Sequence, residues 1–162
     1  MGEKYSDRPY KVYKIQRGTA IDHIPSHMAL KVLEILGIAE GGGIVTIGIN
    51  FDSKTLGKKG VVKIENRILE PRETDLIALV APTATINIIE NGKVVEKRPM
   101  NVPEDIRGLL RCPNPNCVTN MDPEVEPRFH LVGRNQDRNS AEIKLCCHYC
   151  ERVYLNSPEM FT

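Results

Sequence analysis

Alternation of apolar and polar positions marks five strands in the first hundred residues. In IVTIGINF (44–51), every second residue is a large apolar one, which is the period of a strand buried on one face. Asn91-Gly92 separates two apolar runs and is typical of a two-residue hairpin turn. The expected strands cover residues 9–15, 44–51, 61–69, 84–90 and 93–98.

Two helices are expected between these strands. The first follows Pro25, where Ser26 is placed to cap it, and apolar residues then recur at helical spacing until Gly37. The second begins at Pro71, a residue type favoured at the first helical position, and ends before Pro82. The order β-α-β-β-α-β-β predicts a ferredoxin-like antiparallel sheet with one extra strand and two helices on one face.

The composition changes after about residue 100. Residues 98–103 contain two prolines and are expected to form a linker, and residues 103–110 are expected to form a short helix. Three short strands are expected further on, at 128–134, 141–146 and 152–155. About 50 residues with so few large aliphatic side chains bury too little apolar surface to fold alone. We therefore expect an additional cross-link, such as a bound metal ion or disulfides, to stabilise this segment. We therefore predict an α+β chain, with an αβ domain at 1–100 and a small all-β domain at 101–162.

The charge balance argues against some classes of function. The 22 basic and 21 acidic residues leave a net charge of +1, whereas nucleic-acid binders usually carry a clear basic excess. No apolar run approaches the roughly 20 residues of a membrane span, and the polar N-terminus has no signal-peptide stretch. We therefore expect a cytoplasmic protein that binds neither nucleic acid nor membrane. In that compartment, paired cysteines more often indicate metal or redox chemistry than disulfides.

Four of the five cysteines form two short pairs, CPNPNC and CHYC. In such spacings the thiolates of one pair reach the same ion, and two pairs complete a tetrahedron with zinc–sulfur distances of about 2.3 Å. A dithiol redox pair and an iron–sulfur cluster are the alternatives, but a redox pair leaves CPNPNC unexplained. The pattern favours one structural Zn²⁺ with no open position for water, held by Cys112, Cys117, Cys147 and Cys150.

Two neighbours of the second pair are also candidate ligands. Cys146 is adjacent to Cys147 and could replace it, but Cys147 gives the usual two-residue spacing to Cys150. His148 is disfavoured as a ligand because four thiolates already fill a tetrahedral site. We therefore expect Cys146 to be a small buried residue on the strand that enters the pair.

The first hundred residues contain no common catalytic motif. GKKG (57–60) matches the GxxG loop of RNA-binding KH domains, but that loop joins two helices and the flanks here are expected strands. Asp22-His23 could belong to a catalytic set or could cap and pack the first helix; no nucleophile has a recognisable setting, so packing is favoured. Lys63 and Lys97 are expected to be solvated on their strands.

Several longer runs resemble one known family. IQRGTAIDHIPSHMALKVL, IVTIGIN, VVKIENRIL and APTATIN are followed by CPNPNC and CHYCE. In this order and spacing they resemble the regulatory chain of aspartate carbamoyltransferase, an enzyme of pyrimidine synthesis, from about residue 10 onward. The resemblance implies a chain without catalytic activity that forms a homodimer. Its αβ domain would bind nucleoside triphosphates of the CTP, ATP or UTP type as allosteric effectors, and its zinc domain would bind the catalytic chain.

The resemblance also implies roles for individual residues. Asp22 and Lys63 would hold the ribose of the effector; its phosphates would face His23, Asn87 and Lys97, with Val94 packing nearby and the main chain at Ile15 and Gly92 reading the base edge. Gly92 departs from the family because it offers no side chain at that position. On the zinc side, Asn114, Asn116 and Glu151 would contact the catalytic chain.

Two other classes of function remain as alternatives. A zinc ribbon attached to a nucleic-acid-binding αβ domain would bind RNA or DNA with a steep loss of affinity on adding salt. A small zinc enzyme would need a water molecule on the metal, which the four-thiolate count disfavours.

Overall fold

The computed structural model describes residues 14–37, 43–135, 137 and 140–161. The strand expected at 9–15 lies mostly outside these residues, and its described end, Lys14 and Ile15, has no regular structure.

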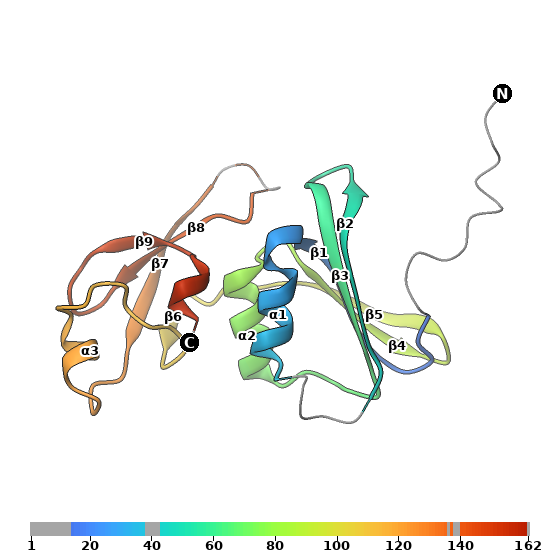
Figure 1. Ribbon diagram of the computed structural model, residues 1–162, viewed down its shortest axis with the longest axis horizontal. Helices are drawn as coiled ribbons and strands as arrows, with labels where there is room; N and C mark the ends of the chain where they lie inside the picture. The colour runs from blue at the N-terminus through green and yellow to red at the C-terminus, as the bar shows by residue number, and fades with distance from the viewer. Residues whose placement is uncertain (1–13, 38–42, 136, 138–139, 162) are drawn as a thin grey trace.

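A five-stranded antiparallel sheet forms the N-terminal half of the molecule (Figure 1). The strands follow the order β2-β3-β1-β4-β5, so the central strand β1 pairs with two strands that come later in the chain. This is the ferredoxin-like plan with β5 added beside β4, as the sequence predicts. The strands are β1 (Gly18–Pro25), β2 (Val45–Ser53), β3 (Gly57–Glu65), β4 (Thr85–Glu90) and β5 (Lys93–Pro99).

The position of β1 differs from the sequence-based expectation, which had left residues 18–25 outside any strand. Thr19, Ala20 and Ile21 are all buried in succession. Because consecutive residues of β1 are buried, apolar and polar residues do not alternate along it, and the period of two is absent here.

The first helical segment begins differently from the prediction and ends as predicted. Ser26 does not cap it: the segment opens as a 3-10 turn, η2 (Ser26–Met28), and the Ser26 hydroxyl instead accepts a 3.1 Å hydrogen bond from the Asn50 amide of β2. The turn continues into α1 (Ala29–Ile35). Gly37 follows with φ of +58°, the left-handed conformation that glycine adopts at little cost after a helix.

Both helices pack on one face of the sheet (Figure 1). The second, α2 (Pro71–Val80), starts at the predicted proline, and the Glu73 carboxylate accepts a 2.9 Å hydrogen bond from the Glu70 amide in a capping box. The core between the layers contains fully buried residues from the sheet and from both helices, among them Ile21, Val62, Val32 and Ile77. No helix in the described part of the chain is long and apolar enough to span a membrane.

A four-stranded antiparallel sheet of order β6-β7-β8-β9 forms the C-terminal half. Its strands are β6 (Asp105–Arg107), β7 (Arg128–Arg134), β8 (Ile143–Cys147) and β9 (Val153–Leu155). The short helix expected at 103–110 is wrong, because the middle of that segment is β6, which pairs with β7. The short helices of this half are α3 (Val118–Met121) and the 3-10 turn η4 (Pro158–Met160).

The helices α1 and α2 lie between the two sheets (Figure 1). The Lys31 ammonium of α1 donates a 2.7 Å hydrogen bond to the Phe161 carbonyl, and the Arg72 guanidinium of α2 donates one of 3.0 Å to the Gly108 carbonyl. Buried residues near the C-terminus, Met160 and Phe161, belong to the same hydrophobic cluster as the helices. The two halves therefore share a continuous core.

Candidate metal centre and polar sheet face

Four cysteine side chains converge in the C-terminal half. Two come from the loop before α3 and two from the end of β8 and the turn after it. The Sγ atoms of Cys112 and Cys150 are 3.7 Å apart, as are those of Cys117 and Cys147. All four sulfur atoms lie within 4.8 Å of one another, and this is the one such cluster of metal-binding side chains among the residues that the structure describes.

The cluster has the dimensions of a tetrahedral thiolate site. Zinc–sulfur bonds of about 2.3 Å place neighbouring sulfur atoms of a tetrahedron about 3.8 Å apart, close to the 3.7 Å of the two shorter pairs. A disulfide would need about 2.05 Å. The four cysteines therefore fit a structural zinc ion, with no position left for a reacting water.

The surroundings help two of the thiols to ionise. Burial opposes the ionisation of Cys150, but hydrogen bonds from the Arg152 amide and the Asn114 side chain prevail and lower its pKa to about 6. Burial also opposes the ionisation of Cys117, yet hydrogen bonds from the Thr119 hydroxyl and amide lower its pKa. Burial raises the pKa of Cys112 to about 12, and it raises that of Cys147. Thiolates that share one cation gain a charge partner that offsets this burial.

The other two candidate ligands do not join the cluster. Cys146 is half-buried on β8, and its thiol lies 3.7 Å from the Cys147 carbonyl. His148 is exposed, and its Nδ1 lies 3.0 Å from Nε2 of His130. Successive residues of a strand point to opposite faces, so Cys146 faces away from the site that Cys147 enters.

The residues expected at a protein interface surround the cysteine cluster. Asn116 and Glu151 are exposed, whereas Asn114 is only 8% exposed. The Asn114 carboxamide oxygen accepts a 3.1 Å hydrogen bond from the Asn116 amide, and its main-chain oxygen accepts one of 2.7 Å from the Asn120 side chain. Asn114 therefore shapes the cysteine loop, and Asn116 and Glu151 lie on its surface.

A row of polar side chains crosses the other half of the molecule. The strand register places Lys63 of β3 opposite Ala20 of β1, Ala20 opposite Asn87 of β4, and Asn87 opposite Lys97 of β5. Directly opposed residues in a sheet share one face. Because neighbours such as Ile21 face the helices, this polar row lies on the face that the helices leave uncovered.

An ion pair next to this row escaped the sequence analysis. The ammonium of Lys59 lies 2.9 Å from the Asp22 carboxylate. Burial acts to raise the pKa of Asp22, but the hydrogen bonds from Lys59 and from the His23 amide outweigh it, so that the pKa is lowered. Lys59 precedes Lys63 by four residues on β3 and therefore shares its face. The sequence-based expectation starts this strand at residue 61, whereas β3 starts at Gly57 and includes Lys59. Because residues 57–60 begin a strand, they cannot be a KH loop between two helices.

His23 occupies a bulge in β1. The pairing of β1 with β3 shifts between Ile21 and Ile24, and His23 has φ of +58°. The ring Nδ1 of His23 is buried and has no hydrogen-bond partner among the residues that the structure describes; a carboxylate oxygen of Asp22 is 3.8 Å away. Strained backbone and an unpaired buried polar atom are features that concentrate at binding sites.

The remaining effector candidates lie at the hairpin between β4 and β5. Asn91 and Gly92 both have positive φ, as the predicted turn requires. The Gly92 amide donates a 2.9 Å hydrogen bond to the Gln16 carbonyl, next to the buried Ile15. Val94 of β5 is 56% exposed and pairs with Ile89, which contacts Ile15 on the polar-row face of the sheet. These residues therefore border one end of the row.

Comparisons with known proteins match both halves of the chain. Residues 10–101 match the family model described as the allosteric domain of the aspartate carbamoyltransferase regulatory chain, and residues 104–157 match the model described as its metal binding domain. A regulatory chain of Methanothermobacter thermautotrophicus is 49% identical over 143 residues, covering 88% of each protein. One of Pyrococcus horikoshii is 50% identical over 145 residues, covering 88% of this chain and 91% of the relative. The chain therefore belongs to the family of aspartate carbamoyltransferase regulatory chains.

Proposed function

We propose that the chain is a non-catalytic subunit whose polar row binds a nucleoside triphosphate and whose cysteine centre docks on a catalytic chain. The observation that carries the proposal is the row itself: Lys63, Asn87 and Lys97 converge from three strands on the uncovered face of the sheet. The names of its relatives support the regulatory role. The alternative of a zinc ribbon that binds nucleic acid is not favoured, because both halves match one regulatory family.

The charges of the row suit a triphosphate. Such a ligand carries about four negative charges, which need several cations and hydrogen-bond donors. These cations and donors are supplied by Lys63, Lys97 and the Asn87 side-chain amide. A third ammonium group, that of Lys59, lies next to the row, where it is paired with Asp22. The buried Nδ1 of His23 gains a partner when a phosphate or ribose oxygen reaches it. Asp22 and Lys63 hold the ribose in this arrangement.

The base then lies towards the β4–β5 hairpin. The main-chain groups of Ile15 and Gly92 border this end of the row, and the exposed Val94 provides an apolar surface beside them. Because Gly92 lacks a side chain, the contacts to the base come from the main chain and from Val94.

The docking surface lies at the cysteine centre. We divide the chain into an effector domain at 1–100 and a zinc domain at 101–162, in which Cys112, Cys117, Cys147 and Cys150 hold the ion. Zinc fixes the loop that carries Asn114 and Asn116 and the turn that carries Glu151, and these residues contact the catalytic chain. Zinc binding at such sites contributes roughly 10–16 kcal/mol to folding, so the surface forms only when the metal is bound.

The effector domains pair with each other. β2 is an edge strand of the five-stranded sheet, and its residues Ile47 and Ile49 are 36% and 46% exposed. Ile49 and the exposed Leu30 also border a groove of about 750 Å³. Exposed apolar residues along an unpaired edge favour association with a second chain. Light scattering of the isolated chain should give the mass of a dimer, and a monomer at high concentration would contradict the pairing.

The test of the proposal is the response of the assembled complex to nucleotides. An effector acts only through a difference in its affinity for two states of the complex, typically about 1–3 kcal/mol. Lys97→Ala removes one phosphate partner without touching the cysteine centre. We expect assembly to persist while the nucleotide concentration at half-response rises by about tenfold or more, because hydrogen bonds to charged groups contribute roughly 1.5–3 kcal/mol.

Lys58→Ala is the matched control. Lys58 lies on the same strand as Lys59 and Lys63 but is paired with Asp52, so the nucleotide response should be unchanged. A Lys97→Ala complex that responds like the unmodified one would place the effector elsewhere. A complex that assembles but responds to no nucleoside triphosphate would make this chain a structural partner only.

A further inference from the structure

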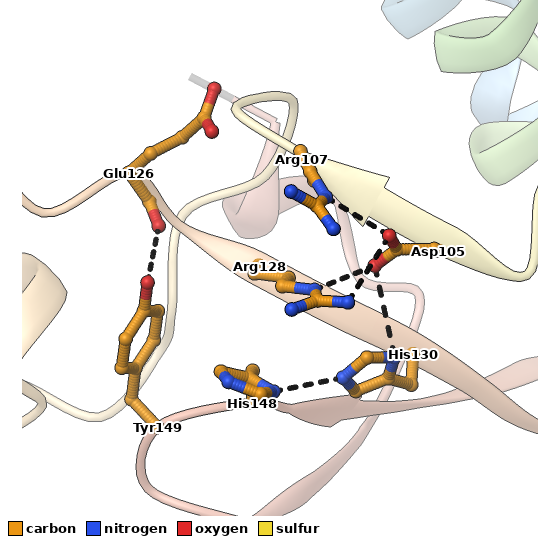
Figure 2. A network of polar contacts seen from close by, with 7 residues as sticks. All are labelled: Asp105, Arg107, Glu126, Arg128, His130, His148 and Tyr149. Carbon is orange, nitrogen blue, oxygen red and sulfur yellow. Dashed lines mark hydrogen bonds and ion pairs between the residues drawn. The ribbon is translucent and has the colours of Figure 1, made fainter.

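Figure 2 shows two neighbouring histidines in the C-terminal half, His130 on β7 and His148 in the turn after β8. Neither belongs to the cysteine cluster. Nε2 of His130 and Nδ1 of His148 are 3.0 Å apart, and the two rings meet edge to face at 62°. The side chain of His130 is 36% exposed, and His148 is also exposed. Two imidazole nitrogens therefore face each other where solvent ions can reach them.

The backbone holds this pair in place. His130 lies on β7 opposite Asp105 of β6 on one side and Cys146 of β8 on the other. The turn after β8 is fixed because the His148 amide donates a 2.8 Å hydrogen bond to the Arg128 carbonyl of β7. His130 thus projects from a paired strand, and His148 projects from a turn that is hydrogen-bonded to that strand.

An aspartate orients the ring of His130. Figure 2 shows the Asp105 carboxylate beside the ring, with its oxygen 3.8 Å from Nδ1 of His130. Hydrogen bonds from Arg128 and then Arg107 lower the pKa of Asp105 to about 2, so it stays ionised. A carboxylate on this side favours the tautomer with its proton on Nδ1, in which Nε2 accepts a hydrogen bond from Nδ1 of His148. A metal ion bound by both nitrogens takes the place of that shared proton. A carboxylate behind a ligating histidine is common at metal sites.

The separation of the two nitrogens selects a coordination geometry. With metal–nitrogen bonds of about 2.0–2.1 Å, two ligands 3.0 Å apart subtend an angle of about 94° at the ion, whereas a tetrahedral ion needs them about 3.4 Å apart. Angles near 90° belong to square-planar or octahedral ions of the copper(II) and nickel(II) class. We propose that His130 and His148 form a second, solvent-accessible site for a divalent transition-metal ion of this class, independent of the zinc centre and of the nucleotide site.

The nearby Cys146 affects the choice of metal ion for testing the histidine pair. Cys146 lies directly opposite His130 on the neighbouring strand, so its thiol is on the same face of the sheet as the ring of His130. Thiols select soft metal ions such as copper(I) and are open to oxidation. Nickel(II) binds imidazoles in the required geometry without this redox chemistry, so it is the better probe for the histidine pair.

The experiment is a titration of the zinc-loaded full-length chain with Ni²⁺, with both metals measured after dialysis. We expect one nickel per chain at unchanged zinc content. His130→Gln and His148→Gln should each weaken nickel binding by more than about tenfold. Asp105→Asn, which removes the orienting carboxylate, should weaken it by about 10–100-fold at most, as such outer partners do.

His27→Gln is the matched control, because His27 is an exposed histidine far from the pair in sequence; it should bind nickel like the unmodified chain. Retention of one zinc by each variant shows that the C-terminal half is still folded. Equal nickel binding by the His130 and His148 variants and the unmodified chain would overturn the proposal. So would nickel uptake that releases an equal amount of zinc, because the ion would then be entering the cysteine cluster.

Discussion

The side-chain amide of Asn156 donates a 2.8 Å hydrogen bond to the main-chain carbonyl of Leu79, which lies 77 residues earlier in the chain. Leu79 belongs to the last turn of α2, where carbonyl groups lack partners within the helix. Asn156 also donates to the Ala141 carbonyl and accepts from the Ile143 amide. One buried side chain of the C-terminal half thus completes the end of a helix in the N-terminal half.

Replacing Asn156 should therefore weaken the contact between the halves. Asn156→Ala leaves a buried donor at Ile143 and buried acceptors at Leu79 and Ala141 without this partner, and we expect a loss of about 2–4 kcal/mol in the free energy of unfolding. Urea unfolding measures it. The exposed Asn101 offers the control, because Asn101→Ala should change the free energy by less than about 0.5 kcal/mol. Equal stability of the two variants would show that the hydrogen bonds of Asn156 contribute nothing.

The cysteine centre gives a second prediction. Cys117→Ala removes one of the four converging sulfur atoms, so stoichiometric zinc and the fold of the C-terminal half should be lost together. Cys146→Ala should keep one zinc per chain, because its thiol lies outside the cluster. Metal analysis and circular dichroism of both variants provide the measurement. Full zinc content in the Cys117 variant would contradict the ligand assignment.

Gly18 should be the least replaceable glycine of the N-terminal sheet. It has φ of +141°, and a Cβ atom there would lie 2.0 Å from the Ile64 carbonyl oxygen of the paired strand. Gly18→Ala should cost more than about 3 kcal/mol of unfolding free energy, since neither backbone can move without breaking the sheet. Gly37→Ala is the control: φ is also positive, but a Cβ atom there would have no atom of the described, non-adjacent residues within 4 Å, so the cost should be about 1 kcal/mol. A milder effect at Gly18 than at Gly37 would contradict the close approach.

The pair of Asp22 and Lys59 predicts a change in pH dependence. The lowered pKa of Asp22 means that its ionised form stabilises the folded chain above the unfolded value near 3.9, and that this stability is lost as the pH falls through the lower folded value. Lys59→Met removes a hydrogen bond and a charge that lower the pKa of Asp22, so the folded pKa should rise. The stability that ionised Asp22 contributes to the folded chain should then be smaller than in the unmodified protein. NMR titration of the Asp22 carboxyl tests this, and an unchanged midpoint in the variant would refute it.

The sequence predicts those elements of the fold that depend on neighbouring residues better than those that depend on pairing with distant strands. The hairpin at Asn91-Gly92 and the start of α2 at Pro71 are encoded by neighbouring residues, and both are confirmed. The strand β1 was missed because consecutive residues of it are buried, which removes the alternating pattern. Residues 103–110 have a helix-like start, but pairing with β7 draws Asp105–Arg107 into a strand. Tertiary pairing therefore overrides the local signal in both places.

The same distinction applies to the candidate sites: the cysteine cluster follows from local spacing, whereas the polar row depends on the pairing of distant strands. Short cysteine spacings predict a shared ion, and the four sulfur atoms do converge. The polar row joins four strands whose register no local pattern reveals, so Asn87 and Lys97 came only from the family resemblance. The bulge at His23 and the ion pair of Lys59 with Asp22 depend on that register as well. Their roles in effector binding stay predictions.

The long separation of the two cysteine pairs has a consequence for synthesis of the chain. Cys117 and Cys147 are 30 residues apart, and at roughly 5–20 residues per second a ribosome needs about 2–6 s to add that length. During this interval the first pair has been made, but its partners do not yet exist. A newly made chain therefore cannot complete the four-thiolate site before Cys150 has been added, so its C-terminal half can take up zinc and fold only after most of the chain has been synthesised.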